Sequence, residues 1–227
     1  MNSRKLLTIL AIATLGFTSA VSANPIIRLS PEGQAAVTVA DGDANDTAAA
    51  AGVVTFNGGL GAWIVNVTTG VGTPPLGPLP SLDLNSINIS SNPGASGNQL
   101  VLELTQTGFT DSIGSVAAFF AEIGGTLASG GQLEWFLYVD LDNDAFGSDI
   151  TIATNTVNTS PFANSGGSSV LLTGPFSMTL RVILTHPDGG TASTSFDFSG
   201  RMVPEPGTLL LIGLGLVGLA LARRKLS

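Results

Sequence analysis

The sequence predicts an all-β protein, a single β-sandwich of roughly ten short strands in an immunoglobulin-like or jelly-roll-like arrangement. Apolar and polar residues alternate in many short stretches, which is the period of a half-buried strand. The chain contains 29 Gly and 12 Pro, which with Asn supply the turns between these stretches. Between residues 24 and 202 no segment repeats its apolar residues with the helical period of 3.6.

The first strands are predicted from alternation and turn residues. Residues 34–40 alternate, and an Asp/Asn/Gly turn at 41–46 ends them. Residues 53–56 form a short apolar run, and 62–68 alternate with Trp63 on the same face as the valines that follow it. The Asn-Gly-Gly sequence at 57–59 lies between these two runs and predicts a hairpin turn there.

The middle of the sandwich begins after a crossing loop. Residues 70–80 contain four prolines, which cannot donate hydrogen bonds to a ladder. Residues 82–90 alternate over nine positions but change parity, which predicts a bulge near 85–86. In 99–105 three leucines share one face, and Glu103 points the other way, where a glutamate is expected to meet water.

The last strands include the most aromatic one. An apolar run at 115–123 precedes the aromatic strand, 133–139, and 150–152 are predicted to pair with that strand as a hairpin. A Ser/Asn/Gly loop is predicted for 155–169. Residues 176–185 and 193–198 are predicted to close the domain as a hairpin across the His-Pro-Asp-Gly-Gly turn at 186–190.

Residues 1–23 have the layout of a secretory signal peptide. A basic start is followed by an apolar stretch and by Val-Ser-Ala, a cleavage sequence that predicts a cut between Ala23 and Asn24. The exported domain, 24–202, then contains three arginines against fifteen acidic residues, a net charge of −12. Nucleic acid is excluded as a partner, because its phosphates require clustered Lys and Arg. The absence of cysteine excludes disulfides and cysteine-based metal sites.

Residues 203–227 form a tail with three parts. Val203, Pro204, Glu205 and Pro206 come first. An uncharged apolar stretch, about 207–222, follows and is just long enough for a transmembrane helix if its ends reach into the interface. Arg223, Arg224 and Lys225 then form a basic cluster that predicts a cytoplasmic end.

This three-part tail resembles the PEP-CTERM protein-sorting tail of exported proteins from Gram-negative bacteria that make extracellular polysaccharide. The resemblance implies recognition by exosortase, a membrane-embedded processing enzyme that acts at or near residues 204–206. Stretches of the exported domain, among them 63–70 and 82–90, are similar to an uncharacterised family of PEP-CTERM proteins, which supports only the fold.

The expected route has the protein exported, anchored transiently in the inner membrane by 207–222, and then placed at the cell surface or outside the cell. The expected partners are the export machinery, exosortase and extracellular polysaccharide. The expected role is structural and non-catalytic, with no required cofactor. The alternative is a carbohydrate-binding or calcium-dependent adhesion module.

Calcium is the one candidate ligand ion. Asp140, Asp142 and Asp144 alternate just past a strand, as in the first half of a calcium loop, and Asp149 is a further candidate ligand. The sixth and twelfth positions, Ala145 and Thr151, depart from the EF-hand pattern. A second loop at 41–46 has the same spacing of Asp and Asn. Solvated acidic turns, which are common in secreted β proteins, are the favoured explanation for both loops.

Catalytic candidates are few. His186, the only histidine, lies in a turn sequence, and the chain lacks the Gly-x-Ser-x-Gly elbow of a serine hydrolase. A paired-carboxylate glycosidase would draw on the strand glutamates Glu103, Glu122 and Glu134. The aromatic residues are a candidate sugar-stacking platform, but the leucines beside Trp135 on its face favour core packing. That candidate platform comprises Trp63, Trp135 and Tyr138.

Overall fold

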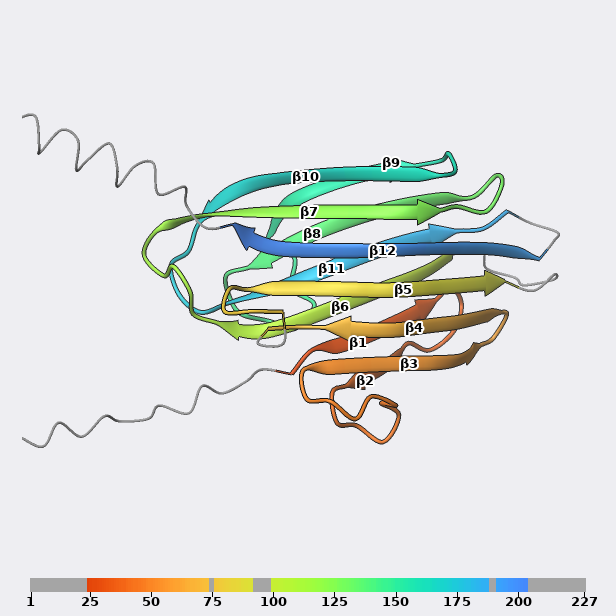
Figure 1. Cartoon of the computed structure of the whole chain (residues 1–227), viewed down its shortest axis with the longest axis horizontal. Helices are drawn as coiled ribbons and strands as arrows, with labels where there is room; N and C mark the ends of the chain where they lie inside the picture. The colour runs from red at the N-terminus through yellow and green to blue at the C-terminus, as the bar shows by residue number, and fades with distance from the viewer. Residues whose placement is uncertain (1–23, 74–75, 92–98, 188–190, 204–227) are drawn as a thin grey trace, which may run out of the picture.

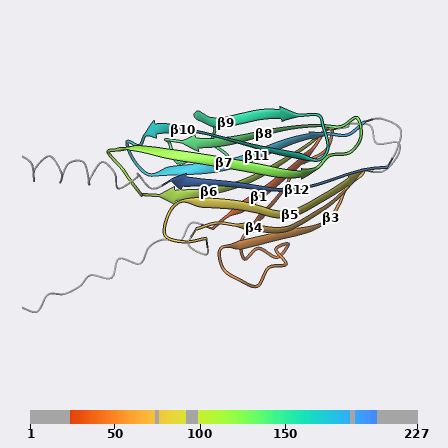
Figure 2. The same cartoon turned by 45° about the horizontal axis from the view of Figure 1, so that its top comes forward.

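The structure is a computed structural model that describes residues 24–73, 76–91, 99–187 and 191–203. It confirms the predicted all-β sandwich: this part of the chain contains twelve strands in two six-stranded antiparallel sheets, packed face to face (Figures 1 and 2). The strands are β1 (Ile26–Pro31), β2 (Val37–Ala40), β3 (Val53–Leu60), β4 (Trp63–Val71), β5 (Ser81–Ser91), β6 (Gln99–Phe109), β7 (Val116–Thr126), β8 (Gln132–Asp140), β9 (Ile150–Val157), β10 (Phe162–Leu171), β11 (Phe176–Thr185) and β12 (Ala192–Val203).

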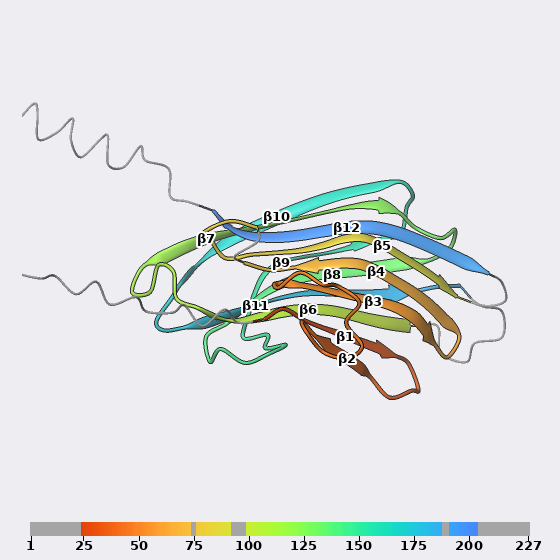
Figure 3. The ribbon, with the colours of Figure 1, turned by 60° about the horizontal axis from the view of Figure 1, so that its bottom comes forward.

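The strand order identifies a jelly roll. Sheet A has the order β2-β1-β6-β11-β8-β9, and sheet B has the order β10-β7-β12-β5-β4-β3. Three antiparallel pairs are nested around the β8–β9 hairpin: β7 pairs with β10, β6 with β11, and β5 with β12. The last eight strands therefore follow the jelly-roll order, with β1–β2 extending sheet A and β3–β4 extending sheet B (Figure 3).

The nested pairing corrects the predicted closing hairpin. β11 lies in sheet A and β12 lies in sheet B, so the segment between them crosses from one sheet to the other. The turn sequence before β12 therefore does not mean that β11 and β12 pair with each other. The partner of each strand lies far away in the sequence, as Ile89 opposite Thr194 shows.

Three other predictions concern single elements. The β3–β4 hairpin exists, but its two-residue turn is Gly61-Ala62, and Asn57-Gly58 lie within β3. The hairpin of β8 with β9 is confirmed. The predicted bulge is also confirmed: two residues of β5, Asn85 and Ser86, lie opposite the single residue Asp197 of β12.

The predicted loop at 155–169 is wrong. Most of it is strand: β9 continues to Val157, and β10 pairs with β7 along ten residues. Glycine and serine suit this edge strand, because a Cβ at Gly167 would collide with the backbone carbonyl of Phe119 on β7. Only Phe162 and Val170 of β10 are buried, so the apolar pattern was too sparse to indicate a strand. β1 was also missed, and the predicted first strand shortens to β2.

The core lies between the two sheets and follows the predicted alternation. Leu100, Leu102 and Leu104 of β6 are fully buried, as are Trp135 and Phe198, whose rings meet edge to face. The edge strands of the two sheets contact each other on both sides of the sandwich. On one side β9 contacts β10, and on the other β2 contacts β3.

Candidate functional site

An open hollow lies on the outer face of sheet B. It has a volume of about 630 Å³ and crosses β10, β7, β12 and β5. Two small residues leave space at the bottom of the hollow: Gly124 of β7 and Ala163 of β10, which lie opposite each other. The other lining residues that point outward are hydroxyls and carboxylates: Asp83, Glu122, Ser165, Asp197 and Ser199.

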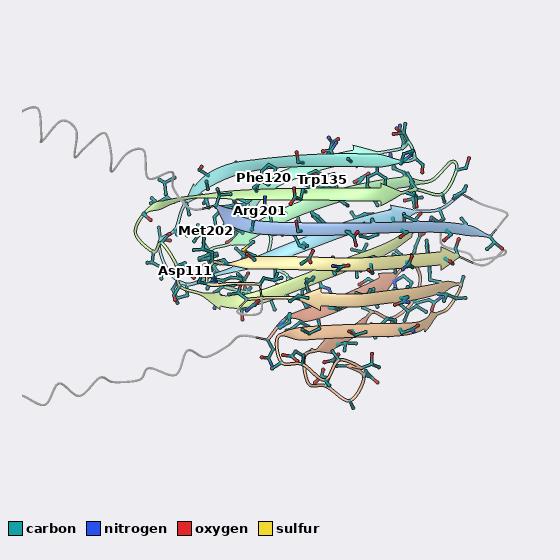
Figure 4. All side chains as sticks on the ribbon, viewed as in Figure 1. Asp111, Phe120, Trp135, Arg201 and Met202 are labelled. Atoms are coloured by element: carbon teal, nitrogen blue, oxygen red, sulfur yellow. The ribbon has the colours of Figure 1, made fainter. Side chains whose placement is uncertain are left out.

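The carboxylates of this hollow are held by hydrogen bonds. The backbone N–H of Ser86 donates to Asp197 at 2.5 Å, which uses the β5 bulge. Arg201 donates to Glu122 at 2.7 Å and places its guanidinium over the ring of Phe120, 5.3 Å from the centroid (Figure 4). Burial, then the charges of Asp197 and Glu122, raise the pKa of Asp83, and a hydrogen bond from Asn85 opposes them. The hollow therefore presents anionic and hydroxyl acceptors to a ligand rich in donors.

A second, smaller hollow of about 270 Å³ adjoins the first and shares Asp83 and Ser199 with it. It leads along β5 and β12 towards Arg201 and Leu76. We call the two together the sheet B hollow. No feature of the sequence pointed to it, because its residues come from four strands that are distant in the chain.

The three strand glutamates are not neighbours. Glu122 lies on the outer face of sheet B, whereas Glu103 and Glu134 belong to β6 and β8 of sheet A, with β11 between them. Glu103 is only 2% exposed, which corrects the expectation that it meets water. It accepts hydrogen bonds from Arg28 at 2.5 Å and from Arg181 at 2.7 Å.

Glu103 is buried because the β8–β9 loop, 141–149, folds over the outer face of sheet A. Phe146 of this loop donates its backbone N–H to Thr105 and places its ring 3.9 Å from the guanidinium of Arg28. Asn143 accepts a hydrogen bond from the backbone of Gly108 at 2.6 Å. This cover could not be predicted from the alternation of β6, which shows only which side a residue faces.

The aromatic residues do not form an exposed platform. Trp63 is 2% exposed and Trp135 is fully buried, which confirms core packing for Trp135. Tyr138 lies on the outer face of sheet A, stacked on Phe136 with ring centroids 5.5 Å apart and covered by Arg181.

The proposed calcium residues share one loop but have other partners. Asp140 is buried, and its carboxylate accepts the backbone N–H of Asp144 at 2.9 Å. Asp149 accepts the backbone N–H of Leu141 at 3.2 Å, while Asp142 is exposed. In the described residues no group of three or more His, Cys, Asp or Glu side chains is arranged to hold a metal ion. Calcium binding at Asp140, Asp142, Asp144 and Asp149 stays a prediction.

The second acidic loop is also organised by its own backbone. Asp41 accepts the N–H of Gly52 at 2.7 Å, and Asp43 accepts that of Ala40 at 3.0 Å. Asp46 accepts from Gly42 and from two further amides of the same region. Through these hydrogen bonds the carboxylates at 41–46 stabilise the loop that contains them.

His186 is buried, not an exposed turn residue. Its Nδ1 shares a 2.9 Å hydrogen bond with Ser91, its Nε2 shares one of 2.8 Å with Thr194, and its ring packs 5.0 Å from that of Trp63. The imidazole thus joins the end of β11 to two strands of sheet B. A Ser-His contact exists, but the third partner is a threonine where a catalytic triad needs a carboxylate.

The end of β12 leads into the tail. Val203 is the last residue of the strand, and residues 204–227 lie outside the described part of the chain, as do residues 1–23. The predicted transmembrane helix, the basic cluster and Ala23 therefore fall outside it as well. In the described part no helix is long and apolar enough to cross a membrane.

Residues 203–225 match the family model of the PEP-CTERM protein-sorting motif. The chain carries a PEP-CTERM sorting motif. The motif indicates an exported protein with a C-terminal sorting signal and implies exosortase-dependent export. No curated protein sequence matches this PEP-CTERM protein.

Solved structures share only the general architecture with the PEP-CTERM protein. The K1 cleaved adhesin domain of Lys-gingipain from Porphyromonas gingivalis is 9% identical over 65% of this chain and 94% of its own, with a TM-score of 0.35. The PA14 sugar-binding domain from an RTX adhesin is 13% identical over 80% and 90%, with a TM-score of 0.35. A family 22 carbohydrate-binding module of Clostridium thermocellum Xyn10B is 14% identical over 72% and 98%, with a TM-score of 0.32. Such low values transfer no ligand to this chain.

Acid is expected to destabilise the PEP-CTERM protein through His186. Burial lowers the pKa of His186 from 6.5 to about 4, so the folded state keeps the ring neutral where the unfolded chain binds a proton. The contribution of His186 to stability is complete above pH 6.5 and is lost as the pH falls through 4, with an upper limit of about 3 kcal/mol.

The measurement is the melting temperature at pH 7 and pH 4 for wild type and His186→Gln. The glutamine variant is less stable at pH 7 but should lose less on acidification, because it has no titrating ring. Equal losses in the two proteins would show that His186 does not contribute to the acid sensitivity.

Proposed function

We propose that this protein is an exported, exosortase-processed component of the cell surface or extracellular matrix, structural and non-catalytic. The observation that supports this most is the sorting motif at 203–225, which follows the last strand of the sandwich without a further domain between them. The signal peptide is cut between Ala23 and Asn24, the stretch 207–222 anchors the protein in the inner membrane, and exosortase acts at or near residues 204–206.

The fold is compatible with the loss of the tail. β12 is paired on both sides up to its end: Val203 lies opposite Ala118 of β7, and the backbone N–H of Met202 donates to Pro80 at 2.8 Å. The buried residues of the core end at Met202. Cleavage beyond Val203 would therefore remove none of the described packing.

The experiment is a substitution in the sorting motif. Glu205→Ala is expected to leave the protein uncleaved in the membrane fraction, whereas the wild type is released with a mass that lacks the tail. Glu32→Ala, an exposed glutamate in the connection after β1, is the matched control and should be released normally. The intact mass and the fraction of each protein decide the result; normal release of Glu205→Ala would contradict the proposed route.

A second candidate function is carbohydrate binding, alone or with calcium. The sheet B hollow favours it, because carboxylate and serine oxygens line an open depression, and sugar hydroxyls need such acceptors. The discriminating measurement is retention of the protein on the polysaccharide of the producing organism, with and without calcium.

A further inference from the structure

Exposed aliphatic side chains gather at one end of the sandwich. In the described part of the chain five large hydrophobic residues are exposed, and four of them share this end: Leu76 (39% exposed), Ile113 (44%), Val116 (53%) and Leu171 (53%). Val116 and Leu171 lie directly opposite each other on β7 and β10. Leu76 and Ile113 belong to the β4–β5 and β6–β7 connections. We call these four residues the apolar end patch.

The fifth residue, Ile64, marks the opposite end. It lies beside the β3–β4 turn, and its neighbour Trp63 pairs with Ser91 at the far end of β5. Ile64 is 50% exposed, close to the value for Val116. Both ends of the sandwich therefore have an exposed aliphatic side chain, but only one end has four of them together.

The tail leaves the sandwich beside the apolar end patch. Val203 pairs with Ala118, two residues from Val116 on the same strand. Ladder spacings place Val116 about 8 Å and Leu171 about 12 Å from the backbone of Val203. Figure 1 shows β12 ending at the same end of the molecule as the β6–β7 connection, and Figure 4 labels Met202 and Asp111 there.

The tail is too short to keep this end far from a membrane. Only Pro204, Glu205 and Pro206 separate Val203 from the apolar stretch 207–222. Fully extended, the chain from Val203 to Gly207 covers no more than about 14 Å. The interfacial layer of a bilayer is itself several ångströms thick, so a protein anchored through 207–222 has its apolar end patch at the lipid surface.

The surroundings of the patch suit a lipid interface. Residues 112–121 and 165–180 contain no charged side chain. Charged residues near the patch include Asp111, Asp83, which lines the smaller hollow together with Leu76, and Arg201, which is already paired with Glu122. The acidic turns at 41–46 and 141–149 lie at the same end of the strands, but they belong to the β2–β3 and β8–β9 connections and not to β7 or β10. Exposed aliphatic groups within uncharged stretches such as these gain from burial in the headgroup boundary.

We propose that the apolar end patch lies on the lipid bilayer while the tail anchors the protein, so that the corner formed by β7 and β10 faces the membrane. The inference rests on the proposed anchoring through 207–222. The four aliphatic side chains contact lipid while the tail is intact and lose this contact when the tail is cut. The sheet B hollow meets the apolar end patch at Leu76, which lines the smaller part of the hollow.

The test uses the absence of cysteine in the chain. Val116→Cys, Leu171→Cys and the matched control Ile64→Cys each receive an environment-sensitive fluorophore in the full-length protein. Each variant is reconstituted into phosphatidylcholine vesicles that carry a lipid-bound quencher. Labels at 116 and 171 should show blue-shifted emission and quenching by the lipid quencher, whereas the label at 64 should respond only to aqueous iodide.

A second variant tests the aliphatic contact itself. Val116→Asp in the protein labelled at 171 should reduce quenching from the lipid, because a carboxylate at the patch resists burial. Vesicle-bound protein with water-exposed labels at 116 and 171 would overturn this inference and leave the anchoring intact. Labels shielded from both quenchers would also overturn it, in favour of contact with a second copy. Failure of every variant to bind vesicles would overturn the anchoring as well.

Discussion

Replacing Gly125 with alanine is expected to destabilise the fold by about 3 kcal/mol, because the new methyl group has no space. Gly125 lies in β7 opposite Phe196 of the central strand β12. A Cβ at this position would overlap the carbonyl oxygen of Ser195 and approach the Cα of Phe196 to 2.7 Å. Both contacts are with backbone, so the two strands would have to separate along their ladder.

Gly124 provides the control from the same strand. A Cβ there meets only the carbonyl oxygen of Phe162, at 3.5 Å, which is an ordinary contact. Gly125→Ala should lower the melting temperature by about 10 °C and Gly124→Ala by much less. Similar melting temperatures for the two variants would show that β7 and β12 adjust without cost.

Replacing Glu103 with glutamine is expected to cost about 2–4 kcal/mol, because it removes the shared counter-charge of Arg28 and Arg181. Glu103 is 2% exposed, and the arginines are 33% and 24% exposed. The partial exposure of the arginines lets water compensate in part, which keeps the expected cost below that of a fully buried pair. We also expect loss of the pair to loosen the contact of Phe146 with Arg28.

The control is the exposed ion pair of sheet B. Arg201 and Glu122 are 46% and 53% exposed, so Glu122→Gln should change stability by less than about 1 kcal/mol. Chemical denaturation of both variants measures the difference. A loss for Glu103→Gln no larger than that for Glu122→Gln would show that the Arg28–Glu103–Arg181 cluster does not stabilise the fold.

Local patterns predicted the faces of strands but not their partners. Alternation correctly buried the leucines of β6 and Trp135, and the change of parity at 85–86 correctly predicted a bulge. Such patterns describe a few neighbouring residues. The pairing of β5 with β12 depends on segments about a hundred residues apart, and nothing within either segment specifies the other.

The candidate sites show the same limit. The sheet B hollow assembles from four strands, so its residues share no spacing in the sequence. Glu103 faces outward as alternation predicts, yet a loop forty residues later covers it. His186 stands in a turn sequence but reaches Ser91, which lies 95 residues earlier. The sorting motif was found from sequence because it is contiguous and needs no fold.

The nested pairing of the jelly roll also sets when the domain can fold. β12 lies in the middle of sheet B, between β7 and β5, and is the last strand of the sandwich in the chain. Sheet B therefore stays open along its centre until this strand arrives, and pairings of such high contact order form slowly. If the chain is exported from its N-terminus, as proposed, its core can be complete only after β12, the segment next to the tail, has crossed the membrane.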